Sequence, residues 1–384
     1  MKRLGETLTE IVWERDLPAS PAVAWPYLVE PDKMSLWSRA PIACVDGGDG
    51  GAAHGVGALR SVTVHALGRE TKFEEVVAES VAPSRFVYHV VRGLPLRDHE
   101  GIQTLESSGA GSRLVWRVRF EPIASPLGFG ASRMLEGQMR TSLDALASVL
   151  GGLADEVDPG VSHAFEDDDA AVPSLLAQAD RILGEQRTLA DSLRDDPKYW
   201  FSRVYQYVTE EQIAFVRTRA THRAWVLRLL PVFHRFYVMN LEAHRAHEHV
   251  EAPWRVAFRS MDRAEDGPSV IRGLLLGVRT HIEEDLPRAL AETWLQHYRA
   301  RCDYVRLRAD YLRMAYVFRV ASSRLVAEMP PTWIPPHLRA LIRFAPLELQ
   351  DWAFSRSYYD VARARRKAFE RGRGIASWIA RATL

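Results

Sequence analysis

Residues 84–122 read SRFVYHVVRGLPLRDHEGIQTLESSGAGSRLVWRVRFEP. Apolar and polar side chains alternate along three runs in this stretch, and the breaks GLPL and SGAGS separate the runs. Alternation with a period of two is typical of half-buried strands, and short Gly-containing breaks join antiparallel neighbours. Two further runs of this kind, ALRSVTVHAL and RETKFEEVVAES, precede the stretch. The sequence therefore predicts an antiparallel meander that ends near residue 122.

The flanks of the meander complete the first domain. Upstream, LTEIVWERDL alternates like a strand, Ser20 and Pro21 are typical of a helix start, and GGDGGAAHGVGA is typical of a loop. Downstream, apolar spacing predicts a long helix over 125–150. The apolar stripe of this helix consists of Leu135, Met139, Leu143 and Leu146. A curved antiparallel sheet wrapped on one long helix is an α+β helix-grip fold, and we expect it to enclose a cavity for an apolar ligand.

Composition limits the class of protein. A chain of 384 residues is too long for one ordinary core and favours two domains. The net charge of +1 gives no reason to expect nucleic acid or an anionic membrane as a partner. Cys44 and Cys302 form no disulfide framework and no C-x-x-C motif, and no signal peptide or run of about 20 apolar residues is found. We expect a cytoplasmic protein without a cofactor; the sequence makes no prediction of its oligomeric state.

The boundary between the two domains is marked by composition. Residues 151–174, GGLADEVDPGVSHAFEDDDAAVPS, are rich in Gly, Asp, Ala and Pro and poor in large apolar side chains, which is typical of a solvated linker. Beyond them the sequence has helical periodicity, and Thr209 with Gln212 resembles a capping box at a helix start. We therefore predict a helix-grip domain over residues 1–152, an acidic linker over 153–174 and an all-α helical domain over 175–384.

Strand parity selects the side chains that face the cavity. In the last strand one face is apolar and the other carries three arginines, so the apolar face should point inward. The residues expected to line the cavity from this strand are Trp116, Val118 and Phe120, next to Leu114. Tyr88 shares its face with Phe86, so Tyr88 is predicted to be a cavity phenol and His89 to face outward.

Four segments resemble the START-like superfamily, also called SRPBCC, and specifically its polyketide cyclase/dehydrase branch. They are SPAVAWPYLVEPDKMSLW, VGALRSV, FEEVVAESVAPSRFVYHV and LVWRVRFEP, and the resemblance covers roughly the first 150 residues. It implies the helix-grip fold and a hydrophobic or polyketide-like ligand. It favours a cyclase- or dehydratase-type enzyme, a lyase or isomerase, in secondary metabolism. A non-catalytic carrier or sensor of a hydrophobic molecule is the alternative, because the superfamily includes both.

The same resemblance suggests site residues. Arg60 and Glu75 stand where the family pattern has its recurrent Arg and Glu, and the pair could polarise a carbonyl or be a structural salt bridge. Tyr88 and His99 are candidate proton donors or acceptors, although a histidine at a strand edge is often simply exposed. Trp37 is a candidate wall of the cavity or an ordinary packed aromatic residue.

The helical half contains a second candidate site in GVRTHIEEDLPRAL. His281 and Asp285 are four residues apart and share a helix face, so they could bind metal, form a His–carboxylate pair or cap helices. The segment resembles the A-H-I-x-x-D-L signature of a bacterial all-α family of unknown function, with Arg279–Thr280 in place of the usual Asn-Ala. His244 and His247 would complete a His/carboxylate metal site, or else lie in a solvated His/Arg run. Metal-dependent chemistry around His281 and Asp285 is therefore a further alternative.

Overall fold

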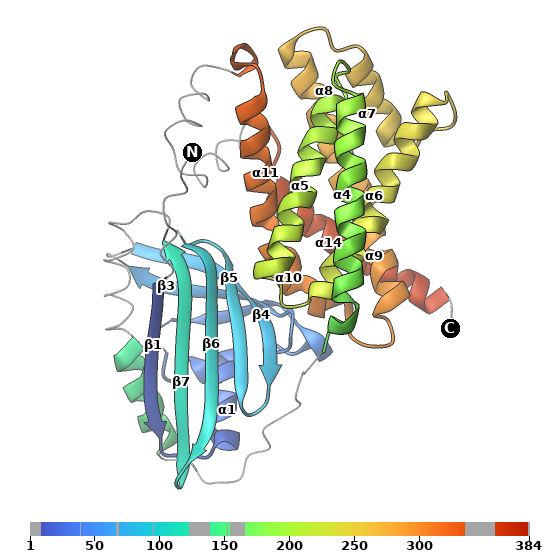
Figure 1. Cartoon of the computed structure of the whole chain (residues 1–384). Helices are drawn as coiled ribbons and strands as arrows, with labels where there is room; N and C mark the ends of the chain where they lie inside the picture. Colours follow the sequence, from blue (N-terminus) through green and yellow to red (C-terminus); the bar gives the residue numbers. More distant parts are fainter. Residues whose placement is uncertain are drawn as a thin grey trace. The chain divides into compact units, whose positions relative to one another are not determined.

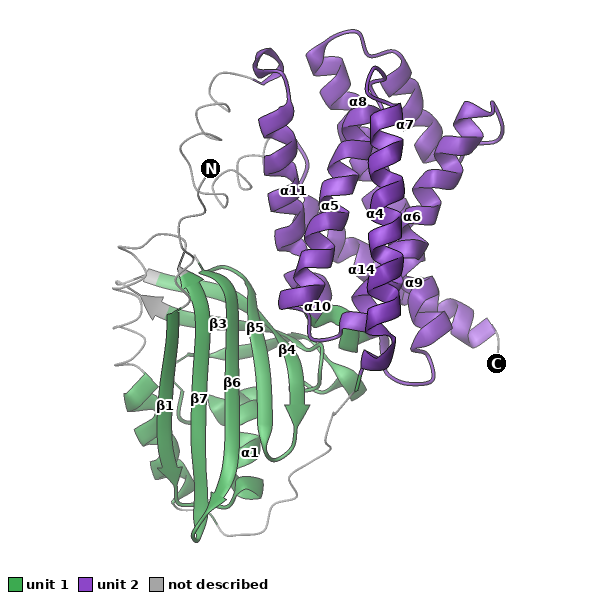
Figure 2. Cartoon of the chain, viewed as in Figure 1, with its two compact units in different colours: residues 1–166, 305–309 green, residues 167–304, 310–384 purple. Residues whose placement is uncertain are grey.

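The structure is a computed structural model that describes residues 9–38, 40–66, 69–94, 96–122, 139–151, 153, 166–334 and 358–382. The described residues form two compact units (Figure 2). Unit 1 contains residues 1–166 together with the short segment Val305–Ala309, and unit 2 contains Asp167–Tyr304 and Asp310–Leu384.

Unit 1 is built on one antiparallel sheet of seven strands in the order β1-β7-β6-β5-β4-β3-β2 (Figure 1). The strands are β1 (Thr9–Leu17), β2 (Ile42–Asp46), β3 (Leu59–Ala66), β4 (Arg69–Val81), β5 (Arg85–Arg92), β6 (Leu96–Ser108) and β7 (Gly111–Pro122). The last five follow one another as neighbours, so the predicted meander is confirmed, and β1 closes it by pairing with β7. Register shifts in β4 and β6 mark β-bulges, which increase the local twist of a sheet.

Helices cover one face of this sheet. Helix α1 (Pro21–Val29) begins with proline at its first position, as predicted, and contacts β6 and β7; α2 (Pro31–Met34) follows. Residues 139–150 are helical, and Leu143, Leu146 and Leu150 are buried in the same core as the sheet. The predicted start of this long helix lies outside the described residues. The α+β helix-grip architecture predicted from the sequence is what unit 1 shows.

Unit 2 is all helical in its described part. Its longer helices are α4 (Val172–Ser192), α5 (Tyr199–Thr218), α6 (Arg223–Arg245), α7 (Ala252–Asp262), α8 (Gly267–Thr280), α9 (Leu286–His297), α11 (Ala315–Glu328) and α14 (Val361–Ala382). A single π-helical turn, η3 (His281–Asp285), joins α8 to α9. Thr209 lies inside α5 and Gln212 bonds the Val226 carbonyl, so the predicted capping box is wrong. A capping box does form at Asp266 and Ser269, before α8.

The acidic segment before unit 2 differs in part from the predicted linker. Helical structure begins at Asp169, in η2 (Asp169–Ala171), and α4 starts at Val172. Asp167 Oδ2 accepts hydrogen bonds from the backbone N–H groups of Ala224 and Trp225, at 2.7 and 3.2 Å. These groups are unpaired donors in the first turn of α6, where a carboxylate is favourable. The end of the acidic run is therefore part of the helical fold.

Candidate functional site

The inner face of the sheet carries the apolar lining that strand parity predicts. On β7 the side chains of Leu114, Trp116, Val118 and Phe120 are buried, whereas the arginines between them are at least partly exposed. Trp116 lies edge-to-face with Trp37, with ring centroids 6.3 Å apart. The indole N–H of Trp37 donates to the Tyr27 carbonyl at 2.7 Å, which fixes the orientation of that ring. Aromatic side chains therefore form a continuous wall on this face.

Arg60 and Glu75 form a buried ion pair at the centre of the lining. They are register partners on β3 and β4, and each side chain is almost completely buried. Arg60 Nε donates to Glu75 Oε1 at 2.8 Å, and Arg60 Nη1 donates to the Val29 carbonyl at 3.1 Å. The guanidinium also lies over the Phe86 ring, 4.9 Å from its centroid. The pair therefore ties α1 to the sheet, as the structural alternative expects.

Tyr88 is held over a glycine on the neighbouring strand. Its register partner on β6 is Gly101, where a Cβ atom would lie only 2.2 Å from the Tyr88 ring. The Tyr88 hydroxyl accepts a hydrogen bond of 3.2 Å from the Trp116 indole N–H. Burial, and then the nearby negative charge of Glu75, raise the pKa of Tyr88 well above its ordinary value. The phenol is therefore protonated at neutral pH and can donate its own proton in a hydrogen bond.

His99 lies beside Tyr88 at a bulge of β6, with ring centroids 5.7 Å apart. It is buried, so the expectation of an exposed strand-edge histidine is wrong. Burial lowers its pKa to about 4, which makes it neutral at pH 7. The Val90 N–H donates to His99 Nδ1 at 3.4 Å, so in the neutral ring the proton is on Nε2 and the side chain is a donor. His89, predicted to face outward, is also buried, with Nδ1 3.0 Å from the His99 carbonyl oxygen.

Sequence reasoning missed Gln103. Its register partners are Phe86 on β5 and Trp116 on β7, so it belongs to the same inner face. Only 2% of its surface is exposed, and its Oε1 atom has no hydrogen-bond partner among the described residues. A buried polar atom without a partner is costly in free energy, so Oε1 is an acceptor available to a bound molecule. The available signal was its position two residues before Leu105, which places both side chains on the same face of the strand.

In unit 2 the structure brings together only part of the predicted metal cluster. His281 and Asp285 are in contact, with Nδ1 and Oδ2 2.8 Å apart. His244 pairs instead with Asp262 at 3.1 Å, and His247 is exposed with a positive φ of 57°. Within the described ranges, no three His, Cys, Asp or Glu side chains are grouped so that they could hold a metal ion.

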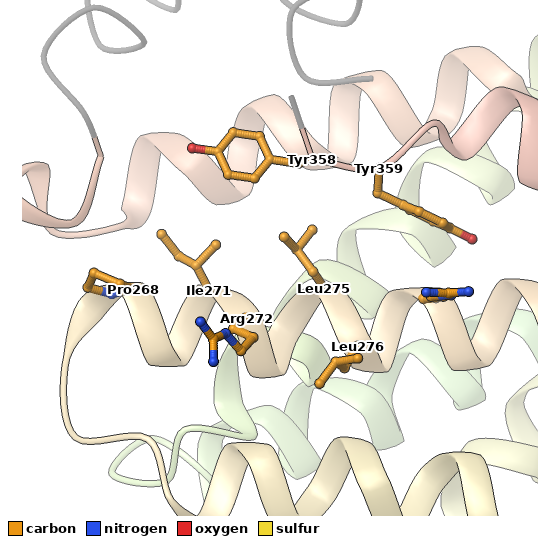
Figure 3. Close-up of a pocket in the computed structure, with 8 residues that line it drawn as sticks. Pro268, Ile271, Arg272, Leu275, Leu276, Tyr358 and Tyr359 are labelled. Atoms are coloured by element: carbon orange, nitrogen blue, oxygen red, sulfur yellow. The ribbon is translucent and has the colours of Figure 1, made fainter. Parts of the chain in front are cut away.

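A groove lies on the surface of unit 2, along α8. Pro268, Ile271 and Leu275 of α8 form one wall, and Tyr358 and Tyr359, which precede α14, lie across from them (Figure 3). Its volume is about 370 Å³, and its lining is mostly apolar.

The fold and the lining of its inner face define a START-like helix-grip unit followed by a helical unit. Residues 9–151 match the family described as polyketide cyclase / dehydrase and lipid transport. Residues 179–380, more than half of the chain, match a family of unknown function (DUF5995). The chain therefore belongs to this second family, and its N-terminal part is similar to the first. No curated protein matches the chain.

Solved structures similar to the chain include Ara h 8.0201 and a START superfamily protein from Mycobacterium smegmatis. The first is 16% identical, covers 38% of this chain and 98% of its own length, and has a TM-score of 0.32. The second is 12% identical, covers 37% of this chain and 98% of its own length, and also has a TM-score of 0.32. In the described part of the chain, no helix is long and apolar enough to cross a membrane.

Proposed function

We propose that unit 1 binds a small aromatic or polyketide-like molecule that carries both a hydroxyl and a carbonyl group, and that it acts on this molecule as a cyclase or dehydratase. The observation that carries the proposal is the unpartnered Oε1 atom of Gln103, buried on an aromatic inner face. The same proposal places this activity in the cytoplasm and in secondary metabolism, as expected from the sequence.

The polar groups on the inner face complement such a ligand. Gln103 Oε1 is an acceptor for a ligand hydroxyl, and the Tyr88 phenol is a donor for a ligand carbonyl. The aromatic walls formed by Trp37 and Trp116 suit a planar, apolar body. Because the groups are fixed by their neighbours in the sheet, they would hold a flexible chain in one reactive conformation.

The chemistry proposed is proton transfer next to a carbonyl. Glu75 takes a proton from the carbon beside the ligand carbonyl, while Tyr88 donates a hydrogen bond to the carbonyl oxygen and stabilises the enolate. In cyclisation the new carbanion attacks a second carbonyl carbon, and the alkoxide that forms takes the proton back from Glu75. In dehydration the carbon–oxygen bond of the β-hydroxyl breaks, and this group leaves as water with the proton that Glu75 returns. His99 is neutral and serves as a further hydrogen-bond donor rather than as a base.

The binding part is tested with 2-naphthol and naphthalene as probes on the full chain. Wild type is expected to bind 2-naphthol about tenfold more tightly than naphthalene, because only the alcohol pairs with Gln103. At the inner face, read from the amide signals of β5, β6 and β7, Gln103→Leu should abolish this preference and keep naphthalene binding. Thr104→Val, on the adjacent outward position of β6, is the control and should behave as wild type. If neither probe binds, the proposal of a hydrophobic site fails.

The catalytic part is tested with a synthetic poly-β-ketothioester. Tyr88→Phe should lower turnover at least 100-fold and weaken binding far less, since the hydrogen bond of the phenol is strongest to the developing oxyanion. Binding of the thioester by wild type without any turnover would overturn catalysis and favour the carrier or sensor instead. Turnover by Tyr88→Phe at the wild-type rate would remove Tyr88 from the mechanism.

A further inference from the structure

His281 sits at the centre of a buried cluster that the proposed function does not use. It is 4% exposed and lies in the π-helical turn η3, where the Leu286 N–H bonds back to the His281 carbonyl five residues earlier. π-Helical turns occur frequently at functional sites. Five aromatic rings surround the imidazole, and Phe233 stacks on it at 3.6 Å between centroids. The other four rings belong to Phe201, Tyr205, Tyr237 and Trp254.

Asp285 fixes the tautomer of His281. Its Oδ2 atom is 2.8 Å from His281 Nδ1 and accepts a second bond from the Trp254 indole at 2.9 Å. Its Oδ1 atom accepts from Arg288 at 2.6 Å, so the carboxylate is held on both oxygens. A carboxylate only accepts, and therefore the His281 proton is on Nδ1 and the lone pair is on Nε2. Burial lowers the pKa of His281, so the ring is neutral at pH 7.

Three polar atoms of this cluster have no hydrogen-bond partner among the described residues. They are Nε2 of His281, the hydroxyl of Tyr205 and Oε1 of Gln186. All three side chains are at least nine-tenths buried. The Tyr205 ring lies 4.9 Å from His281, and Gln186 approaches the region through His234, whose Nδ1 is 3.3 Å from Gln186 Nε2. Leaving several polar atoms unpaired at one place inside a bundle is costly, and a bound molecule would satisfy them.

We propose that this cluster is a second site, which binds a small uncharged molecule bearing a hydroxyl group. The hydroxyl donates to His281 Nε2 and accepts from the Tyr205 phenol. An anion would face the lone pair of Nε2 and the charge of Asp285, and a cation would find no unpaired carboxylate among the described residues of the cluster. The aromatic walls favour a ring or short alkyl group as the rest of the molecule.

Phenol and toluene are the probes, because they have nearly the same shape and only phenol has a hydroxyl group. The full chain is labelled with ¹⁵N-histidine, and the Nε2 signal of His281 is assigned by its loss in His281→Phe. Phenol should shift this signal in a saturable manner, and toluene should bind at least tenfold more weakly. The readout is local to unit 2, so phenol bound at the inner face of unit 1 does not confound it.

Tyr205→Phe separates a ligand site from a structural one. It should weaken phenol binding at His281 at least tenfold without lowering the stability of the ligand-free chain, because the hydroxyl has no partner to lose. Tyr237→Phe is the matched control: that hydroxyl bonds Ser202 at 2.7 Å, so stability should fall and phenol binding should not change. A Tyr205→Phe chain that is less stable and binds phenol normally would show a hydroxyl satisfied by structural water and overturn the proposal. An Nε2 signal unmoved by phenol would overturn it too.

Discussion

The buried Arg60–Glu75 ion pair is expected to stabilise the sheet of unit 1. Glu75→Gln leaves the buried guanidinium of Arg60 without its counter-charge, and we expect a loss of about 3–5 kcal/mol in the stability of the sheet. The double variant Arg60→Met/Glu75→Leu should lose less than Glu75→Gln, because it leaves no lone charge. Hydrogen exchange of β3 amides in the full chain measures both changes.

A surface pair on the same sheet provides the control for this prediction. Glu79 pairs with Arg85 at 3.0 Å, and both side chains are about one-third or more exposed. Glu79→Gln should therefore change the stability by no more than about 1 kcal/mol. If Glu75→Gln proved equally mild, the Arg60 charge would have access to water and the pair would not be a structural anchor.

His99 gives the sheet a defined response to acid. Its pKa is about 4 in the folded chain, against about 6.5 for an unfolded histidine, so between these pH values only the unfolded chain binds the proton. As far as it depends on His99, the free energy of unfolding should therefore have its full value above pH 6.5. It should fall by up to about 3 kcal/mol as the pH drops to 4. His99→Gln should flatten this dependence, measured by hydrogen exchange of β5 and β6 amides. An unchanged slope would contradict the prediction.

At the residue scale, the sequence predicted side chains whose position follows from strand parity or short spacing. The inward Trp116 and the contact between His281 and Asp285 are of this kind. It did not predict that Gln103 and Tyr205 each have a buried polar atom without a hydrogen-bond partner among the described residues. Whether such an atom has a partner depends on side chains from other strands or helices, which the local sequence does not contain. The bulge in β6 that buries His99 likewise depends on the pairing with β7.

At the scale of elements, the N-terminus of α6 is stabilised by Asp167, a residue far from it in the sequence. Asp167 accepts from two backbone donors of its first turn, and the Tyr298 hydroxyl donates to the other oxygen at 3.0 Å. Asp167→Ala should cost about 1–2 kcal/mol, as the loss of a helix cap does. Asp169→Ala removes only an exposed pair with Arg223 and should change stability by less than about 0.5 kcal/mol. Equal effects in hydrogen exchange of α6 amides would refute the capping role.

This cap also explains why the predicted linker extended too far. Composition alone shows that an acidic run cannot form a core, but it does not show that a helix elsewhere offers free N–H groups to a carboxylate. The predicted capping box at Thr209 failed for a related reason, since its residues continue a helix that packs as one element from Tyr199. The strands of unit 1 were predictable because alternation is a local property.

At the scale of the whole molecule, unit 1 is assembled from two separate parts of the chain. The segment Val305–Ala309 belongs to it, and Arg308, which is 3% exposed, donates to the Gly57 carbonyl at 2.8 Å and pairs with Asp46. Gly57 has a φ of +86°, and a Cβ atom there would lie 1.9 Å from the Val305 carbonyl oxygen. Composition predicted a single boundary between the domains, at the acidic run. It gave no indication that Val305–Ala309, far beyond this boundary, belongs to unit 1.

The discontinuity predicts that residues 1–166 alone do not reproduce unit 1. Without Arg308, the Gly57 carbonyl and the Asp46 carboxylate lose a buried charged partner, and hydrogen bonds to charged groups contribute about 1.5–3 kcal/mol each. Arg308→Met in the full chain should therefore speed hydrogen exchange at the paired β2 and β3 amides by at least tenfold, and the isolated 1–166 chain should exchange there at least as fast. Arg15→Met, which removes an exposed pair with Asp144, is the control and should leave these amides unchanged. Slow exchange in the isolated chain would show that the sheet is complete without the segment Val305–Ala309.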